Sequence, residues 1–238
     1  MLLPQQSAIE GFLASVPPYA ELDQRALKRI ARTAAQFEAP RRTVIFRPGE
    51  SAAGIHILMS GHVKLALPAR DHAEKVIAIV GPGQSFGELG MFLQEPHMLS
   101  AESVDHARIV RVDKAAILAC IKRNPEFATG MITALGRRLR DLIREIDSWR
   151  RRSGVQRVIE FLANELPVDA VQGTACVVLP AKKRIIASRL DLTHEHFSRI
   201  LRELAEASLI SVAGPTIAIH DVRKLRELAD APRAAAPI

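Results

Sequence analysis

Hydrophobic positions between residues 37 and 113 come in short runs separated by turn residues, a pattern typical of short strands rather than helices. The turn signals include Arg47-Pro-Gly49, Gly81-Pro-Gly83 and Gly87. Several short strands with this punctuation predict an antiparallel β-sandwich or β-roll. The predicted strands lie at 44–46, 55–58, 63–67, 76–80 and 107–110.

Helical periodicity appears on both sides of these strands. Residues 1–36 favour helices that break at Val16-Pro17-Pro18, and a helical period returns from Lys114. A long helix is predicted to start at Asn124-Pro125, because proline is tolerated in the first turn. Its apolar residues recur in steps of three and four, as in a coiled coil, and predict a dimer interface. The stripe comprises Met131, Leu135, Leu139, Leu142, Ile146 and Trp149. Packing of this helix only against its own β-domain is the alternative.

The C-terminal third begins with a predicted helix at 155–166 and a strand at 175–179. Two short helices follow, joined at Asp191-Leu192, with Thr193 placed to cap the second helix. Downstream, short strands around Gly214-Pro215 predict a hairpin, which would complete a winged helix-turn-helix. An ordinary helical hairpin with a solvated face is the alternative. The apolar positions of the helix pair are Ile185, Ile186, Leu190, Phe197, Ile200, Leu201 and Leu204.

The opposite face of the second helix carries Glu195, Ser198 and Arg199, which project the same way because they stand at i, i+3 and i+4. In a helix-turn-helix, early residues of the second helix contact base edges in the major groove. We predict base contacts from these three side chains. Six basic and two acidic side chains lie between 182 and 202, which favours phosphate contacts nearby. The predicted backbone contacts are Lys182, Lys183, Arg184, Thr193 and His194.

Composition narrows the class of protein. A net charge of +7 in 238 residues favours a polyanionic partner, and no apolar run is long enough to cross a membrane. The N-terminal sequence lacks a secretion signal, so we expect a cytoplasmic protein. The two cysteines, Cys120 and Cys176, exclude a disulfide scaffold and a four-cysteine iron–sulfur or zinc site, and we expect both thiols to be buried. No hydrolase, P-loop or zinc-protease motif is present, so we predict no enzymatic activity.

These patterns predict an α+β chain with an N-terminal β-domain and a C-terminal DNA-binding domain. The predicted parts are a β-roll with N-terminal helices at 1–123, a dimerisation helix at 124–150, a winged helix at 151–228 and a disordered tail at 229–238.

This order of parts resembles the Crp/Fnr superfamily of bacterial transcription regulators, over roughly residues 20–225. Arg47-Pro-Gly-Glu50 with Gly61 is similar to the roll motif of that family, and 85–92 resembles its phosphate-binding cassette. Residues 197–201 and 209–214 match its recognition helix and wing. The resemblance implies a homodimer that binds double-stranded DNA, and contact with RNA polymerase if the protein is an activator.

The resemblance also bears on the effector. In members that bind cyclic AMP, the cassette ends with an Arg-Ser pair, and a Thr-Ser pair on the dimer helix meets the base. Here 96–101 contains no arginine, and the Thr-Ser positions fall on Leu142 and Ile143. Without that guanidinium a buried cyclic phosphate loses its charge-assisted partner, so we predict no cyclic AMP binding.

An apolar effector pocket is the resulting expectation. Its predicted residues are Gly87, Glu88, Leu89, Met91, Phe92, Met98, Leu99, Leu142 and Ile143. The spacing of residues 86–104 resembles the Dnr-type nitric-oxide regulators, which implies haem as a candidate cofactor. A modified pocket for a cyclic nucleotide or another small molecule is the alternative. The candidate axial ligands of a haem are His56, His62, His72, His97, His106 and Met98.

The DNA site follows from the same resemblance. In the Fnr-type branch, Glu-x-x-Ser-Arg contacts a TTGAT half-site, and this chain has Glu195-His-Phe-Ser198-Arg199. We therefore predict an inverted repeat close to TTGAT-N4-ATCAA. A ligand-binding module with no DNA function is the competing hypothesis.

Overall fold

The computed structural model describes residues 4–68, 74–151, 153–167, 170 and 172–230, with the backbone alone at 4–5, 144–151 and 230. Two compact units divide the chain, Met1–Arg140 and Asp141–Ile238, and we describe each by itself. In the described residues, no helix combines the length and the apolar character that crossing a membrane requires.

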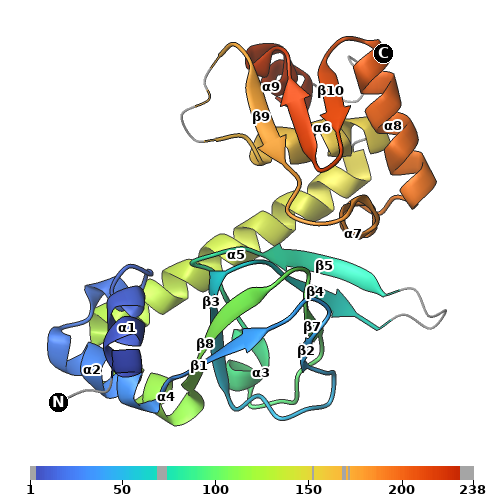
Figure 1. Ribbon diagram of the computed structural model, residues 1–238. Helices are drawn as coiled ribbons and strands as arrows, with labels where there is room; N and C mark the ends of the chain where they lie inside the picture. Colours follow the sequence, from blue (N-terminus) through green and yellow to red (C-terminus); the bar gives the residue numbers. More distant parts are fainter. Residues whose placement is uncertain (1–3, 69–73, 152, 168–169, 171, 231–238) are drawn as a thin grey trace. The chain divides into compact units, whose positions relative to one another are not determined.

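The first unit is built on an antiparallel β-roll, as predicted (Figure 1). One sheet has the order β1-β8-β3-β6 and the other β2-β7-β4-β5. Apolar side chains from both sheets, such as Phe46, Leu58, Val63 and Ile109, form one core cluster. The strands are β1 (Ala35–Ala39), β2 (Val44–Phe46), β3 (Gly54–Ser60), β4 (Val63–Leu67), β5 (Lys75–Val80), β6 (Ser85–Phe86), β7 (Ser100–Ser103) and β8 (Ala107–Asp113).

Three of these strands were not predicted. β1 lies where we expected the N-terminal helices to end, and it pairs with β8 from Ala35↔Arg111 to Ala39↔Ala107. Its alternation of Gln36 and Glu38 with small or aromatic residues is too weak a pattern for a local prediction. β6 has two residues, and β7 is Ser-Ala-Glu-Ser, so partner strands rather than local propensity determine both.

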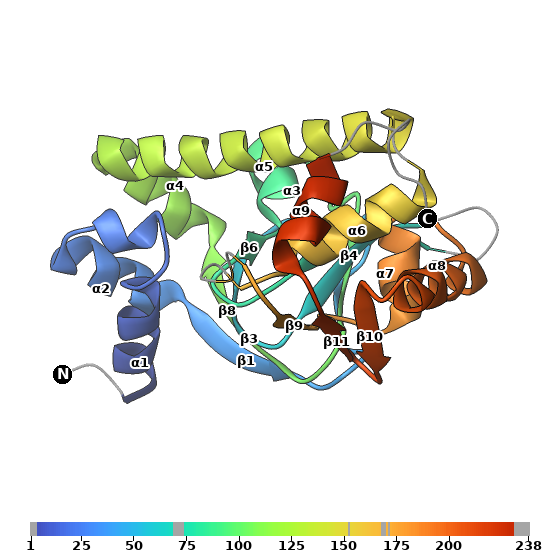
Figure 2. The same cartoon turned by 90° about the horizontal axis from the view of Figure 1, so that it is seen from above.

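Helices gather at one end of the roll, where α1, α2 and α4 lie together in Figure 2. The side chain of Asp23 caps α2 by accepting a hydrogen bond from the Ala26 amide at 2.6 Å. Tyr19 and Phe127 pack edge to face with ring centroids 5.3 Å apart. The helices are α1 (Pro4–Leu13), the 3-10 helix η1 (Tyr19–Glu21), α2 (Gln24–Thr33), α3 (Glu88–Leu93), α4 (Lys114–Arg123) and α5 (Pro125–Arg151).

The predicted dimer stripe on α5 differs from the structure at Met131. The Met131 side chain is 6% exposed and belongs to the core cluster formed with these helices. The first turns of α5 pack against the chain's own helices, and this covers the apolar face there. Leu135, Leu139 and Leu142 remain exposed.

The second unit contains the helix-turn-helix and its wing (Figure 1). Ser153 and Gln156 form a capping box at the start of α6, each bonding the other's backbone amide. The sheet has the order β10-β11-β9, and β10 pairs with β11 from Ile210↔Ile219 to Ala213↔Thr216 around Gly214. The elements are α6 (Gly154–Asn164), β9 (Ala175–Val178), α7 (Lys183–Arg189), α8 (His194–Glu206), β10 (Ile210–Ala213), β11 (Thr216–Ile219) and α9 (Val222–Asp230).

Two expectations for this part of the chain were wrong. Cys176 is exposed, because it alternates with the buried Val177 along β9, while Cys120 is buried as predicted. The predicted tail begins too early, since Ala229 lies in α9 and is 7% exposed. The rest of that tail, 231–238, lies outside the described residues.

Candidate nucleic-acid interface and effector region

Helix α8 is held in place by its apolar face. Phe197, Ile200 and Leu204 are fully buried, and Leu201 is nearly so. The chain enters the helix through Asp191, whose φ of 57° is left-handed, and through Thr193. The Thr193 hydroxyl accepts a hydrogen bond from the His196 amide at 3.1 Å, which satisfies an otherwise unpaired donor of the first turn. One face of α8 is thereby fixed to the core.

The other face of α8 brings together the three predicted base-contacting residues. Glu195 and Arg199 are exposed and Ser198 is half-buried. With Arg202 they line one open depression. The Arg199 Nε lies 3.7 Å from Glu203 Oε1, one turn further along the helix. This pair orients the guanidinium while leaving it 65% exposed.

Local hydrogen bonds keep the Glu195 carboxyl ionised. Bonds from its own backbone amide and from the Thr193 side chain lower its pKa, and nearby His194 acts in the same direction. Glu195 therefore presents a carboxylate, an acceptor without a proton of its own.

The predicted phosphate contacts lie at helix starts. Lys182 stands at the N-cap position of α7 and is exposed, without a capping bond from its side chain. Lys183 and Arg184 open the first turn of α7, and His194 is exposed at the start of α8. Within the described residues, no carboxylate lies within ion-pair distance of Lys182, Lys183 or Arg184. These cations are thus available to an external anion.

The cassette of the roll turns at Gly87, whose φ of 90° suits glycine. The side chain of Glu88 follows at the start of α3 and is only 7% exposed. A Cβ at Gly87 would lie 3.2 Å from His56 Nδ1, so the backbone passes close to that ring.

An arginine that sequence reasoning did not assign reaches this cassette. Arg138 on α5 donates from Nη1 to the Ser85 carbonyl at 3.0 Å and lies 3.8 Å from the Glu88 carboxylate. It thereby supplies a cation to a nearly buried acidic side chain. The only feature of the sequence that points to Arg138 is its position on α5, next to the apolar stripe but outside it.

The residues predicted to line an effector pocket lie in different surroundings. Met91 is 1% exposed and lies in the core beside the N-terminal helices, and Phe92 packs against the same cluster. Leu99 packs instead against the core between the two sheets. Leu89 and Met98 are at least half exposed, as is Ile143, and Leu142 is 39% exposed. The Met91 side chain thus joins the packed core, and its role in an effector pocket stays a prediction.

Two segments of the chain match family models. Residues 36–124 match the cyclic nucleotide-binding domain, and residues 156–228 match the Crp-like helix-turn-helix domain. The chain belongs to the Crp/Fnr family. Its members are DNA-binding transcription regulators, and the predicted fold class is confirmed.

Curated Crp/Fnr relatives cover most of the chain. A CRP-like cAMP-activated global transcriptional regulator of Mycobacterium tuberculosis is 25% identical over 219 residues, which are 91% of this chain and 98% of the relative. The cyclic AMP receptor protein of Thermus thermophilus is 26% identical over 190 residues, 80% and 86% of the two chains. The structure of FixK2 from Bradyrhizobium japonicum has a TM-score of 0.74 at 23% identity, covers 86% of this chain and 99% of its own, and shows a shared fold.

The candidate haem ligands of this Crp/Fnr protein are dispersed. His62 Nδ1 lies 2.8 Å from Asp105 Oδ2, and His106 Nε2 lies 3.4 Å from Glu38 Oε2 at the surface. His72 lies outside the described residues. Met98 is 56% exposed. In the described part of the chain, no group of three or more histidine, cysteine or carboxylate side chains is arranged to hold a metal ion.

Among the candidate ligands that the structure describes, only His56 and His97 are buried. The His97 ring stacks on Phe46 at 3.7 Å between centroids, and the His56 ring stacks on Phe86 at 5.1 Å. His56 Nδ1 is buried and finds no hydrogen-bond partner among the described residues. The backbone at Gly87 lies beside this atom, since a Cβ added to Gly87 would be 3.2 Å from His56 Nδ1 and 3.6 Å from His97 Cε1. These residues do not fit a haem in the arrangement observed.

Burial keeps both imidazoles neutral. Desolvation lowers the pKa of His56 to about 3, with smaller effects from His97 and Arg111. Desolvation also lowers the pKa of His97, against a small raising effect of Glu50.

Proposed function

We propose that this Crp/Fnr protein is a homodimeric regulator that binds an inverted repeat close to TTGAT-N4-ATCAA. The observation that carries this proposal is the row of Glu195, Ser198 and Arg199, of which Ser198 is half-buried and the other two are exposed, on a helix whose opposite face is buried. A rigid helix that presents a carboxylate, a hydroxyl and a guanidinium early in its length suits the major groove.

Each group has a matching base edge. Arg199 can donate two parallel hydrogen bonds to guanine O6 and N7, and the ionised Glu195 can accept from a cytosine amino group. Ser198 can lie against a thymine. Lys182, Lys183 and Arg184 would neutralise phosphates, together with Thr193 and His194 at the start of α8.

The dimer proposal rests on α5. Beyond Met131 this helix exposes Ile132 (69%), Leu135 (40%) and Leu139 (60%), and Leu142 and Ile143 follow in the same helix. A stripe of this kind is costly in water and is the usual mark of a helix–helix interface. Two more predicted members, Ile146 and Trp149, have side chains outside the described residues. A dimer would set two recognition helices about one turn of DNA apart.

We propose an effector other than cyclic AMP, although the Mycobacterium tuberculosis relative is cAMP-activated. Residues 96–101 contain no arginine. The Arg138 guanidinium already donates a hydrogen bond to the Ser85 carbonyl and pairs with the Glu88 carboxylate. Arg138 and the exposed Leu139 are neighbours on α5, so a ligand that displaces Arg138 would act on the helix that carries the dimer stripe. Such a ligand would change the pairing of α5 and with it the spacing of the two recognition helices.

Haem as a sensor of nitric oxide stays a prediction, and the packing of His56 and His97 gives it no support. Titration of the purified protein with haem tests this prediction. The haem hypothesis requires a saturable, stoichiometric Soret band that responds to nitric oxide, and absence of that band would remove it.

Selection of bound sequences from random DNA tests the proposed function. The full-length protein should enrich the inverted repeat, and light scattering should give a dimer. Enrichment of no sequence by a folded dimer would favour the ligand-binding module.

Contact with RNA polymerase is expected if the repeat lies at an activated promoter. We also propose that the protein is cytoplasmic and has no enzymatic activity.

A further inference from the structure

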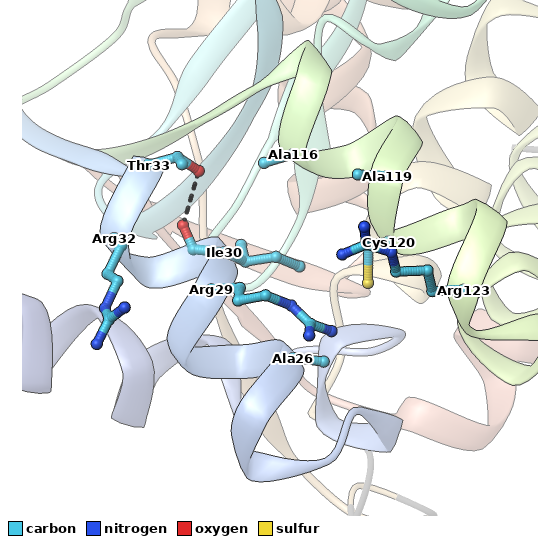
Figure 3. A pocket seen from close by; sticks show the side chains of 9 residues that line it. All are labelled: Ala26, Arg29, Ile30, Arg32, Thr33, Ala116, Ala119, Cys120 and Arg123. Carbon is cyan, nitrogen blue, oxygen red and sulfur yellow. Dashed lines mark hydrogen bonds between the residues drawn. The ribbon is translucent and has the colours of Figure 1, made fainter.

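A pocket separate from the cassette lies between α2 and α4. It has a volume of about 320 Å³, near the lower end of the range of small-molecule sites, which is roughly 300–1,000 Å³. Small side chains leave this space, because Ala26 on α2 faces Ala116 and Ala119 on α4 (Figure 3). Ile30 and the Cys120 thiol complete an apolar floor.

Three arginines surround this floor: Arg29 and Arg32 from α2, and Arg123 from α4. Figure 3 shows Arg29 reaching toward the Cys120 side of the pocket and Arg32 pointing away from it. All three side chains are exposed, and no carboxylate of the described residues forms an ion pair with them. The nearby Asp23 is engaged in capping α2. The pocket therefore combines an apolar floor with uncompensated positive charge.

We propose that this pocket binds a small organic carboxylate with an apolar body. A guanidinium holds a carboxylate through two parallel hydrogen bonds, and an apolar body would cover Ile30 and the alanines. Inorganic phosphate would satisfy the arginines and leave the floor in water. A neutral amide would cover the floor without pairing with the arginines.

The position of the pocket gives binding a structural consequence. Cys120 and Arg123 belong to the last turn of α4, and only Asn124 separates α4 from α5. The Asn124 side chain donates to the Cys120 carbonyl at 3.0 Å and to its sulfur at 3.4 Å. A ligand on this turn would thus contact the joint at which the long helix begins.

Isothermal titration of the full-length protein with sodium octanoate tests the proposal, with octanamide and inorganic phosphate as matched probes. Octanoate should bind at one site per chain and at least tenfold more tightly than either control. Absence of octanoate binding, or equal binding of octanamide or phosphate, would overturn the proposal.

Variants locate the site. The double change Arg29→Gln with Arg123→Gln should weaken octanoate at least tenfold, and Ala119→Trp, at an exposed position, should block the pocket. Arg25→Gln on the same helix is the control and should leave affinity unchanged, since Arg25 does not line the pocket. Circular dichroism checks that each variant is folded. Equal loss with Arg25→Gln, or full binding by folded Ala119→Trp, would contradict the assignment. This test does not involve DNA, so it stands or fails independently of the proposed function.

Discussion

Helices α8 and α3 both begin at a turn with a left-handed residue, yet the sequence predicts their exposed side chains with very different success. α8 has 13 residues and a single core to face, so its apolar period fixes which side meets solvent. α3 has six residues, and its neighbours pack against two different core clusters. Periodicity thus identifies the exposed face of the long helix α8 and fails on the short helix α3.

The largest expected effect is a loss of stability that differs between the buried and the exposed face of α3. Met91→Ala should lower the free energy of unfolding of the roll by about 2–5 kcal/mol, because Met91 is buried in the core. Leu89→Ala on the same helix, at a half-exposed position, should cost far less. Native-state hydrogen exchange at β3 and β8 measures both changes. Similar losses at the two positions would mean that α3 does not divide its faces in this way.

Arg138→Gln tests the link between α5 and the cassette. It leaves the nearly buried Glu88 without its cation and should cost about 1–3 kcal/mol of unfolding free energy. The double change with Glu88→Gln should recover part of that loss, which a double-mutant cycle quantifies. Additive losses would show that the two side chains do not interact.

The buried histidines predict a pH dependence of stability. The pKa of His56 is lowered to about 3 in the folded chain from 6.5 in the unfolded one, so the unfolded state binds the proton first. The stability that the neutral His56 contributes is fully present above pH 6.5 and is lost as the pH drops toward 3. At pH 5 this lowers the free energy of unfolding by about 2 kcal/mol. Urea denaturation at pH 7 and pH 5 should show it. His56→Phe should reduce the difference and His106→Gln, at the surface, should leave it; an unchanged difference in His56→Phe would refute the assignment.

Thr193→Ala, at the N-cap of α8, is expected to change stability least. Loss of the bond to the His196 amide should destabilise α8 by about 1 kcal/mol, and Thr193→Ser should restore it. Exchange of the amides in the first turn of α8 measures the change. Identical protection in the alanine and serine variants would exclude the capping role.

How far the sequence could predict this molecule depends on the range of the interactions involved. The strands at 44–46 and 63–67, the helix start at Pro125 and the turn before α8 follow from local patterns and agree with the structure. β1 and β7 depend on pairing with distant strands, and Arg138 reaches the cassette from 50 residues further along the chain. Met131 misled us because the sequence shows an apolar stripe but not which part of it the chain itself covers.

The most direct test of base recognition by α8 is the binding of Arg199→Ala to the TTGAT inverted repeat and to scrambled DNA, measured by fluorescence anisotropy at fixed salt. Loss of a guanine contact should weaken binding to the repeat by about 1–3 kcal/mol, or about 5- to 150-fold, and relax selection at that base, with little change on scrambled DNA. Lys183→Ala, the control for a phosphate contact, should weaken both equally. An equal loss on both DNAs for Arg199→Ala would contradict the assignment of this face of α8 to base recognition.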